Sequence, residues 1–264
     1  MNLVLVSTMW KSFIQIVIIL GLSVFVNCSS DDERARKEFD LGLRLVSREQ
    51  YDKAIDAFQE AIRITPNFFD AHYELGRTQM YKLEWEQAVI SLRRATELNT
   101  EHARAFMTLG WVYGNWGRYF KSNKAILEAI RLDSAWLEKS YSDLGKNCFY
   151  LGEYDQAINY LRKVLAPSHS RIVYDYYHMG LSHYYLDQWD SAVVWLNKAT
   201  AVEIKERTLS QESQSRGLCR LGYAYYEMKE YDKAIAALED CIELDPINSL
   251  AFRVLGSSPL CQYK

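Results

Sequence analysis

The residues best suited to catalysis or metal binding are few, and their spacing does not assemble a site. The chain has five histidines and five cysteines among its 264 residues. A common helical zinc site needs two histidines four positions apart with a glutamate between them, and no pair here has that spacing. His178 and His183 lie five apart, and we expect them to pack or to face solvent. No phosphate-binding glycine loop and no nucleophile beside a base is evident, so we predict a protein that is not an enzyme and needs no cofactor or metal.

The aromatic residues indicate recognition instead of catalysis. The chain has 19 tyrosines and seven tryptophans. These side chains combine a large rigid contact area with a polar group, which is why they are enriched in recognition surfaces. Elements that present several of them on one face would make a binding surface for another protein.

A repeat positions these residues. Its clearest mark is a glycine after a leucine or methionine, at Gly42, Gly76, Gly110, Gly145, Gly180, Gly222 and Gly256. The spacing is 34 or 35 residues, except for 42 between Gly180 and Gly222. Twelve residues after each of the first six glycines comes a small residue, at Ala54, Ala88, Ser122, Ala157, Ala192 and Ala234. Apolar residues recur at steps of three and four on both sides of a polar break, which predicts two amphipathic helices per repeat, with the glycine allowing their close approach.

This spacing and residue set resembles the tetratricopeptide repeat family over about residues 35–256. The resemblance implies an all-α fold, a right-handed superhelical α-solenoid of about six helix-turn-helix repeats with a short C-terminal capping segment. The solenoid would cover residues 35–264, with repeats near 35–68, 69–102, 103–136, 138–171, 173–206, 215–248 and a partial one over 249–256. About eight inserted residues near 207–214 would lengthen the join before the sixth repeat. At the C-terminus, either a short capping helix closes the stack or the natural protein is longer.

The resemblance also implies a binding groove, because in the family the first helix of each repeat lines a concave face. Carried over position by position, the lining consists of Phe39, Tyr73, Arg77, Tyr81, Trp111, Lys146, Phe149, Tyr150, Tyr174, Tyr177, Tyr184, Tyr185, Tyr223 and Tyr226. Packing between helices is the alternative role for any one of these rings. Some members grip a partner's C-terminal carboxylate with Lys, Asn and Arg, but Phe39 and Leu43 occupy two of the required positions in the first repeat. Arg104, Arg216 and Arg220 are expected in solvent.

An export signal is predicted over residues 1–28, followed by a short acidic linker over 29–34. The uncharged apolar run at 12–26 is shorter than the roughly 20 residues that a membrane-spanning helix needs. Phe25-Val26-Asn27-Cys28 resembles the lipobox of bacterial lipoproteins, which implies lipidation at Cys28 and attachment to a membrane. A cleaved soluble signal and an uncleaved anchor are the alternatives.

The remaining cysteines follow no disulfide framework. Cys241 stands at one of the small-residue positions of the repeat, so a buried thiol is expected there. A disulfide with Cys219, formed after export, is the alternative.

The functional hypothesis is a non-enzymatic scaffold, tethered to a membrane in the bacterial cell envelope, that binds partner proteins or peptides during assembly of an envelope or secretion structure. A regulatory adaptor that docks onto and activates an envelope enzyme is the alternative. The exported chain would lie at the outer membrane or the periplasmic face, or else be secreted or soluble in the periplasm. With 31 basic against 34 acidic residues and no basic run, nucleic acid is not an expected partner, and a small-molecule ligand is not expected either.

Overall fold

Every regular element in the described part of the chain is a helix. A computed structural model describes residues 30–164, 172–206 and 209–257. The predicted all-α solenoid of helix pairs is confirmed, and the described helices divide between two compact units, with the division after Trp116. The export segment 1–28 and the lipidation candidate Cys28 lie outside the described residues. Among the helices that are described, none has the length and apolar character needed to cross a membrane.

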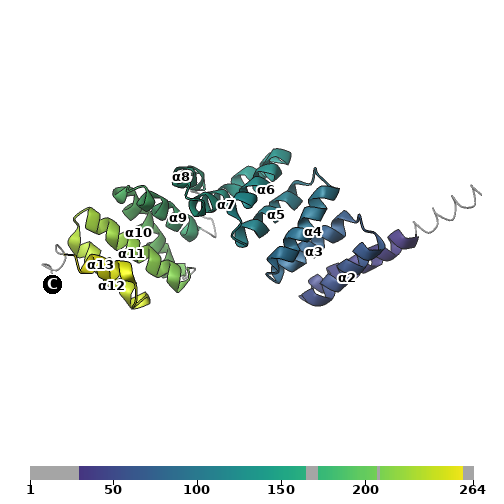
Figure 1. Cartoon of the computed structure of the whole chain (residues 1–264), viewed down its shortest axis with the longest axis horizontal. Coiled ribbons are helices and arrows are strands. Elements are labelled where there is room, and N and C mark those ends of the chain that lie inside the picture. The colour runs from purple at the N-terminus through teal and green to yellow at the C-terminus, as the bar shows by residue number, and fades with distance from the viewer. Residues whose placement is uncertain (1–29, 165–171, 207–208, 258–264) are drawn as a thin grey trace, which may run out of the picture. The chain divides into compact units, whose positions relative to one another are not determined.

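The first unit contains five helices. A helix over residues 30–46 precedes α2 (Tyr51–Ile64), α3 (Phe69–Tyr81), α4 (Trp85–Leu98) and α5 (Ala103–Asn115). From α2 to α5, successive helices of the unit pack side by side in chain order, as can be followed in Figure 1. Their buried faces include Phe39, Phe58 and Leu75, which belong to one apolar core.

The second unit continues the same alternation. Its elements are α6 (Tyr119–Leu132), the short 3-10 helix η1 (Ser134–Trp136), α7 (Leu137–Tyr150), α8 (Tyr154–Arg162), α9 (Ile172–Tyr185), α10 (Trp189–Glu206), α11 (Gln211–Glu227), α12 (Tyr231–Leu244) and α13 (Ser249–Leu255). Neighbours in this series again pack on one another. The short α13 contributes Ala251 and Val254 to the core formed with α11 and α12, so it covers part of their apolar face.

The repeated glycine is required because the two helices of a repeat approach closely. At Gly145 on α7, an added Cβ would lie 2.5 Å from Cγ of Leu161 on α8. At Gly180 on α9, it would lie 2.7 Å from Cγ of Leu196 on α10. Carbon atoms in contact prefer separations of about 3.5–4.0 Å, so neither site accepts a side chain without rearrangement. The facing small residue Ala157 is fully buried, as the steric argument from the sequence requires.

The irregular spacing before the sixth repeat mainly lengthens helices. α10 has 18 residues and α11 has 17, whereas α9 and α12 have 14 each. The inserted residues 211–214 lie within α11 and are not part of an extended loop. The structure therefore differs from the expectation that the insertion lengthens only the join.

A disulfide joins the two helices of the sixth repeat. Cys219 on α11 and Cys241 on α12 are both fully buried, and their Cα atoms are 5.4 Å apart. The expectation of a free buried thiol at Cys241 is therefore wrong, because the small position on α12 directly faces Cys219. Cys148 on α7 is buried and free.

Candidate partner-binding surface

In the first unit, the predicted groove residues divide between packing and exposure. Tyr73 is only 8% exposed, and its hydroxyl lies 3.3 Å from Oγ1 of Thr108 on α5, so it packs between α3 and α5. Tyr81 at the end of α3 and Trp111 on α5 are both exposed. Tyr73 thus matches the packing alternative, and the other two rings are available to a partner.

Arg77 is held by its own helix. Its guanidinium forms an ion pair with Glu74 at 2.9 Å, donates to the Tyr81 hydroxyl at 3.3 Å and lies 5.6 Å from the centre of the Tyr73 ring. These contacts orient Tyr81 and leave Arg77 as a half-buried support.

In the second unit, aromatic contacts form a continuous series across α7, α9 and α11, each the first helix of its repeat, and extend to α6. Tyr150 of α7 stacks on Tyr119 of α6, with ring centres 4.6 Å apart. Tyr184 of α9 meets Tyr223 of α11 at 5.8 Å. We call the residues joined by these contacts the aromatic surface. They are Phe149, Tyr150, His178, Tyr184, Tyr185 and Tyr223. Tyr150 and Tyr185 are the exposed tyrosines within it, so rings packed against one another also reach solvent.

Arg220 adds a positive charge to the aromatic surface. Its guanidinium donates to the Tyr185 hydroxyl at 3.0 Å and lies 5.6 Å from the centre of the Tyr184 ring. Arg220 is expected in solvent from its sequence position, but the rings of α9 partly cover it because it lies on the α11 face turned towards them. Arg216, one helical turn earlier, is exposed and paired with Glu212. Lys146 on α7 is half-buried, and its charge acts on His178.

Several buried polar atoms at this surface have no hydrogen-bond partner within the described protein. They are Nε2 of His178, the hydroxyl of Tyr177 and Nε of Arg220. Nδ1 of His178 lies 2.7 Å from the carbonyl oxygen of Tyr174 and donates to it, so Nε2 is left as an acceptor. Burial lowers the pKa of His178 to about 4, which keeps the ring neutral at neutral pH. Burial also raises the pKa of Tyr177 to about 12, although the charges of Arg216 and Arg220 oppose the rise.

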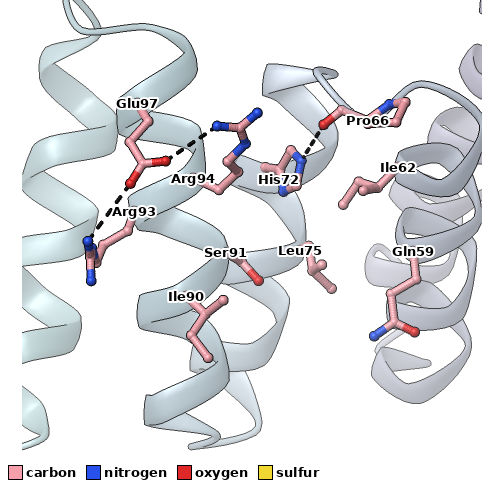
Figure 2. A pocket seen from close by; sticks show the side chains of 10 residues that line it. All are labelled: Gln59, Ile62, Pro66, His72, Leu75, Ile90, Ser91, Arg93, Arg94 and Glu97. Carbon is pink, nitrogen blue, oxygen red and sulfur yellow. Dashed lines mark hydrogen bonds and ion pairs between the residues drawn. The ribbon is translucent and has the colours of Figure 1, made fainter.

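A shallow hollow of about 670 Å³ lies in the first unit, away from the aromatic residues. Figure 2 shows Ile62, Leu75 and Ile90 along its apolar wall. Glu97 pairs with Arg94 at 3.4 Å and with Arg93 at 3.9 Å, as the dashed lines in Figure 2 indicate. One glutamate therefore pairs with both arginines at the edge of the hollow. This hollow offers apolar contact but little unmet polar chemistry.

Metal chemistry finds no support in the described part of the chain, where no group of three or more His, Cys, Asp or Glu side chains could hold an ion. Tyr119 and Arg220, which contact the aromatic surface, were not predicted from the sequence, whereas Tyr185 was. Tyr119 and Arg220 lie outside the family positions that were carried over. The position of Arg220 in the repeat could have predicted its contacts. It lies one helical turn before Ala224, on the face of its helix opposite the repeat glycine.

The helix-pair architecture defines a class of repeat protein, and sequence comparison agrees. A TPR repeat profile matches residues 42–82, and tetratricopeptide repeat profiles match 138–166 and 215–248. The chain therefore contains tetratricopeptide repeats in these segments, in both units.

Particular relatives share this architecture at low identity. The chain is 25% identical to a peroxisomal targeting signal receptor of Pichia angusta over 224 residues, which is 83% of this chain and 32% of the receptor. It is 27% identical to a TPR repeat-containing protein of Methanocaldococcus jannaschii over 50% of this chain and 23% of that protein. The chain thus spans about a third or less of the length of these relatives.

Solved structures with the same fold include pilF of Pseudomonas aeruginosa and the MamA protein. The pilF structure has a TM-score of 0.59 and 20% identity, covering 89% of this chain and 98% of that one. MamA has a TM-score of 0.58 and 26% identity, covering 67% of this chain and 97% of that one. These likenesses agree with the all-α solenoid class.

Proposed function

We propose that the chain is a non-enzymatic scaffold that binds protein or peptide partners, chiefly on the aromatic surface of the second unit. The observation that carries this proposal is that the partly exposed rings of Tyr150, Tyr185 and Tyr223 belong to one series of aromatic contacts beside the Arg220 guanidinium. A bound segment that covers these rings would bury apolar surface, which stabilises a complex by roughly 25 cal/mol per Å².

The charges beside these rings specify the partner segment. The half-buried guanidinium of Arg220 can donate to a carbonyl or carboxylate oxygen. Lys146 and Arg220 add positive charge beside Tyr150 and Tyr184. The surface therefore suits an extended segment with acidic and apolar side chains. In the first unit, exposed Tyr81 and Trp111 supply aromatic contact area for the same kind of partner.

The decisive experiment begins with in-cell cross-linking of the full chain in its native host, which identifies the partner. The affinity of the purified partner is then measured for the wild type and for Tyr150→Ala/Tyr223→Ala. We expect at least about tenfold weaker binding, or about 1.4 kcal/mol, because aromatic side chains are common hot spots. Phe120→Ala is the matched control, since Phe120 is 73% exposed and lies on α6 outside the aromatic surface. A folded double variant with unchanged affinity would reject this assignment of the surface.

We further propose that the chain is exported and tethered in a bacterial envelope through lipid on Cys28, where it takes part in assembling an envelope or secretion structure. The lipobox-like sequence before Cys28 supports this proposal. The Cys219–Cys241 disulfide also supports export, because structural disulfides persist mainly in oxidising compartments.

The mass of the N-terminus of the protein isolated from its native host tests the tether. We expect a diacylated Cys28 as the first residue. A mature chain that begins at Ser29 would contradict the lipid anchor and indicate a cleaved soluble signal. A retained leader would contradict it and indicate an uncleaved anchor.

A further inference from the structure

A separate pocket lies beside the two lengthened helices of the second unit. It has a volume of about 490 Å³ and is bordered by α9, α10, α11 and α12. Its walls are mostly apolar, with Leu196, Ala199, Leu209, Leu218 and Leu244. Small-molecule sites typically have roughly 300–1,000 Å³ and apolar walls with a few polar groups. The pocket therefore has the size and lining of a ligand site.

Gly217 lets an aromatic ring form part of the pocket. A Cβ at this position of α11 would lie 3.2 Å from Cε2 of Tyr177 on α9. Because glycine has no side chain, the Tyr177 ring borders the pocket and adds an aromatic contact to the aliphatic wall.

Most polar groups of the wall are already paired within the protein. The Thr200 hydroxyl donates to the carbonyl oxygen of Leu196 at 3.0 Å, and the Gln214 amide donates to that of Leu209 at 3.1 Å. The Ser213 hydroxyl accepts from Ser210 at 3.1 Å. A ligand therefore does not need to supply hydrogen-bond partners for these groups.

Two carboxylates are different. Asp240 and Glu243 project from α12 at the exposed side of the pocket, and no described group pairs with either of them. Among the described residues that line the pocket, none is Lys, Arg or His. The described lining therefore places two acidic side chains, and no basic one, beside an apolar interior.

We propose that this pocket binds an apolar organic amine. An aliphatic or aromatic group lies against Leu196, Leu218 and Tyr177, and the ammonium lies beside Asp240 and Glu243. An anionic molecule of the same length would bring its charge against two carboxylates and is excluded. The site is distinct in chemistry from the aromatic surface, which favours acidic partners, and it gives the scaffold a small-molecule ligand that the sequence did not predict.

The test compares n-octylammonium with n-octanoate, which share a chain and differ in charge. Each is titrated into the full chain with ¹³C-labelled leucine methyl groups, and the resonances of Leu196, Leu209, Leu218 and Leu244 are followed by NMR. We expect octylammonium to shift these resonances in a saturable way at millimolar concentration and octanoate to bind at least about tenfold more weakly. Octylammonium that leaves these methyl groups unchanged, or octanoate that binds equally well, would overturn the proposal.

Charge variants on α12 provide the second arm. Asp240→Asn/Glu243→Gln should weaken octylammonium binding at least about tenfold while leaving the helical content unchanged, since both side chains are exposed. Glu239→Gln is the matched control, because Glu239 lies on the same helix but borders a different hollow. Equal binding by the wild type and the double variant would show that the carboxylates do not recognise the ligand, which would also overturn the proposal.

Discussion

The close approach of α7 and α8 at Gly145 allows a quantitative test of the packing of the repeat. An alanine there would place its Cβ 2.5 Å from Cγ and 2.7 Å from Cδ2 of Leu161, but 3.4 Å from the carbonyl oxygen of Ala157. Overpacking of this kind typically costs about 1–3 kcal/mol. Replacing a helical glycine with alanine gains up to about 1 kcal/mol in helix propensity. Gly145→Ala should therefore lower the free energy of unfolding by up to about 2 kcal/mol.

A double-mutant cycle with Leu161→Ala isolates the contact. Leu161→Ala alone should cost about 2–5 kcal/mol, because Leu161 is fully buried. In that background the clashing atoms are absent and only the ordinary 3.4 Å contact with Ala157 remains, so Gly145→Ala should be neutral or stabilising. The coupling energy should be about 2 kcal/mol, within the range for residues in contact. Urea unfolding of the four chains, followed by circular dichroism, measures it.

The equivalent site on α9 is the control. At Gly180 an added Cβ would also lie 2.9 Å from the backbone nitrogen of Leu196, which no side-chain truncation can remove. Leu196→Ala should therefore relieve Gly180→Ala only in part, and the coupling should be smaller than at Gly145. If the costs of Gly145→Ala and Leu161→Ala were additive, the view that the glycine is needed to admit the facing leucine would be refuted. The same holds if truncating the leucine relieved the glycine substitution equally at Gly145 and Gly180.

Three further predictions concern titration and cysteine chemistry. Since burial lowers the pKa of His178 from its ordinary 6.5 to about 4, the unfolded chain binds this proton first, and the free energy of unfolding should fall by up to about 3 kcal/mol between pH 6.5 and 4. His178→Gln should flatten that part of the curve, and an unchanged curve would contradict the burial argument. Mass spectrometry without reduction should recover Cys219 and Cys241 as one linked peptide pair, and replacing both with alanine should cost about 3 kcal/mol of unfolding free energy, given their separation of 22 residues. Cys148 should resist alkylation until the chain unfolds, because burial raises the pKa of its thiol to about 11; rapid labelling of the native chain would contradict this.

The helix pairs could be predicted because their packing rule is local and recurs in sequence. Gly145 and Ala157 are twelve residues apart, so their contact can be inferred once the connecting turn is recognised. Repetition then confirms the rule at Gly180 and Ala192 without knowledge of the fold. In this chain the all-α class follows from steric positions that every repeat shares.

The features that the sequence did not predict, or predicted only as an alternative, depend on contacts that the repeat does not specify. Pairing between Cys219 and Cys241 requires the side chains of α11 and α12 to point at each other, whereas their spacing matches no known framework. Burial of Arg220 depends on Tyr184 and Tyr185 from the preceding repeat, 35 or more residues away in sequence. Such contacts arise only after neighbouring repeats have stacked, so one repeat read alone does not reveal them.

Departures from the repeat are therefore where this chain carries its individual chemistry. A residue that fits the repeat is used in packing, as the fully buried Ala157 and Leu161 are. Where a small position becomes Ser122, its hydroxyl accepts a hydrogen bond from the amide of Asn147 at 2.8 Å, and a polar contact between α6 and α7 replaces an apolar one. Where the spacing between repeat glycines grows to 42 residues, longer helices border the pocket that Asp240 lines. If the repeat supplies only the scaffold, Gly145→Ala should lower the free energy of unfolding and leave the affinity for octylammonium intact, while Asp240→Asn should weaken octylammonium binding and leave the free energy of unfolding unchanged.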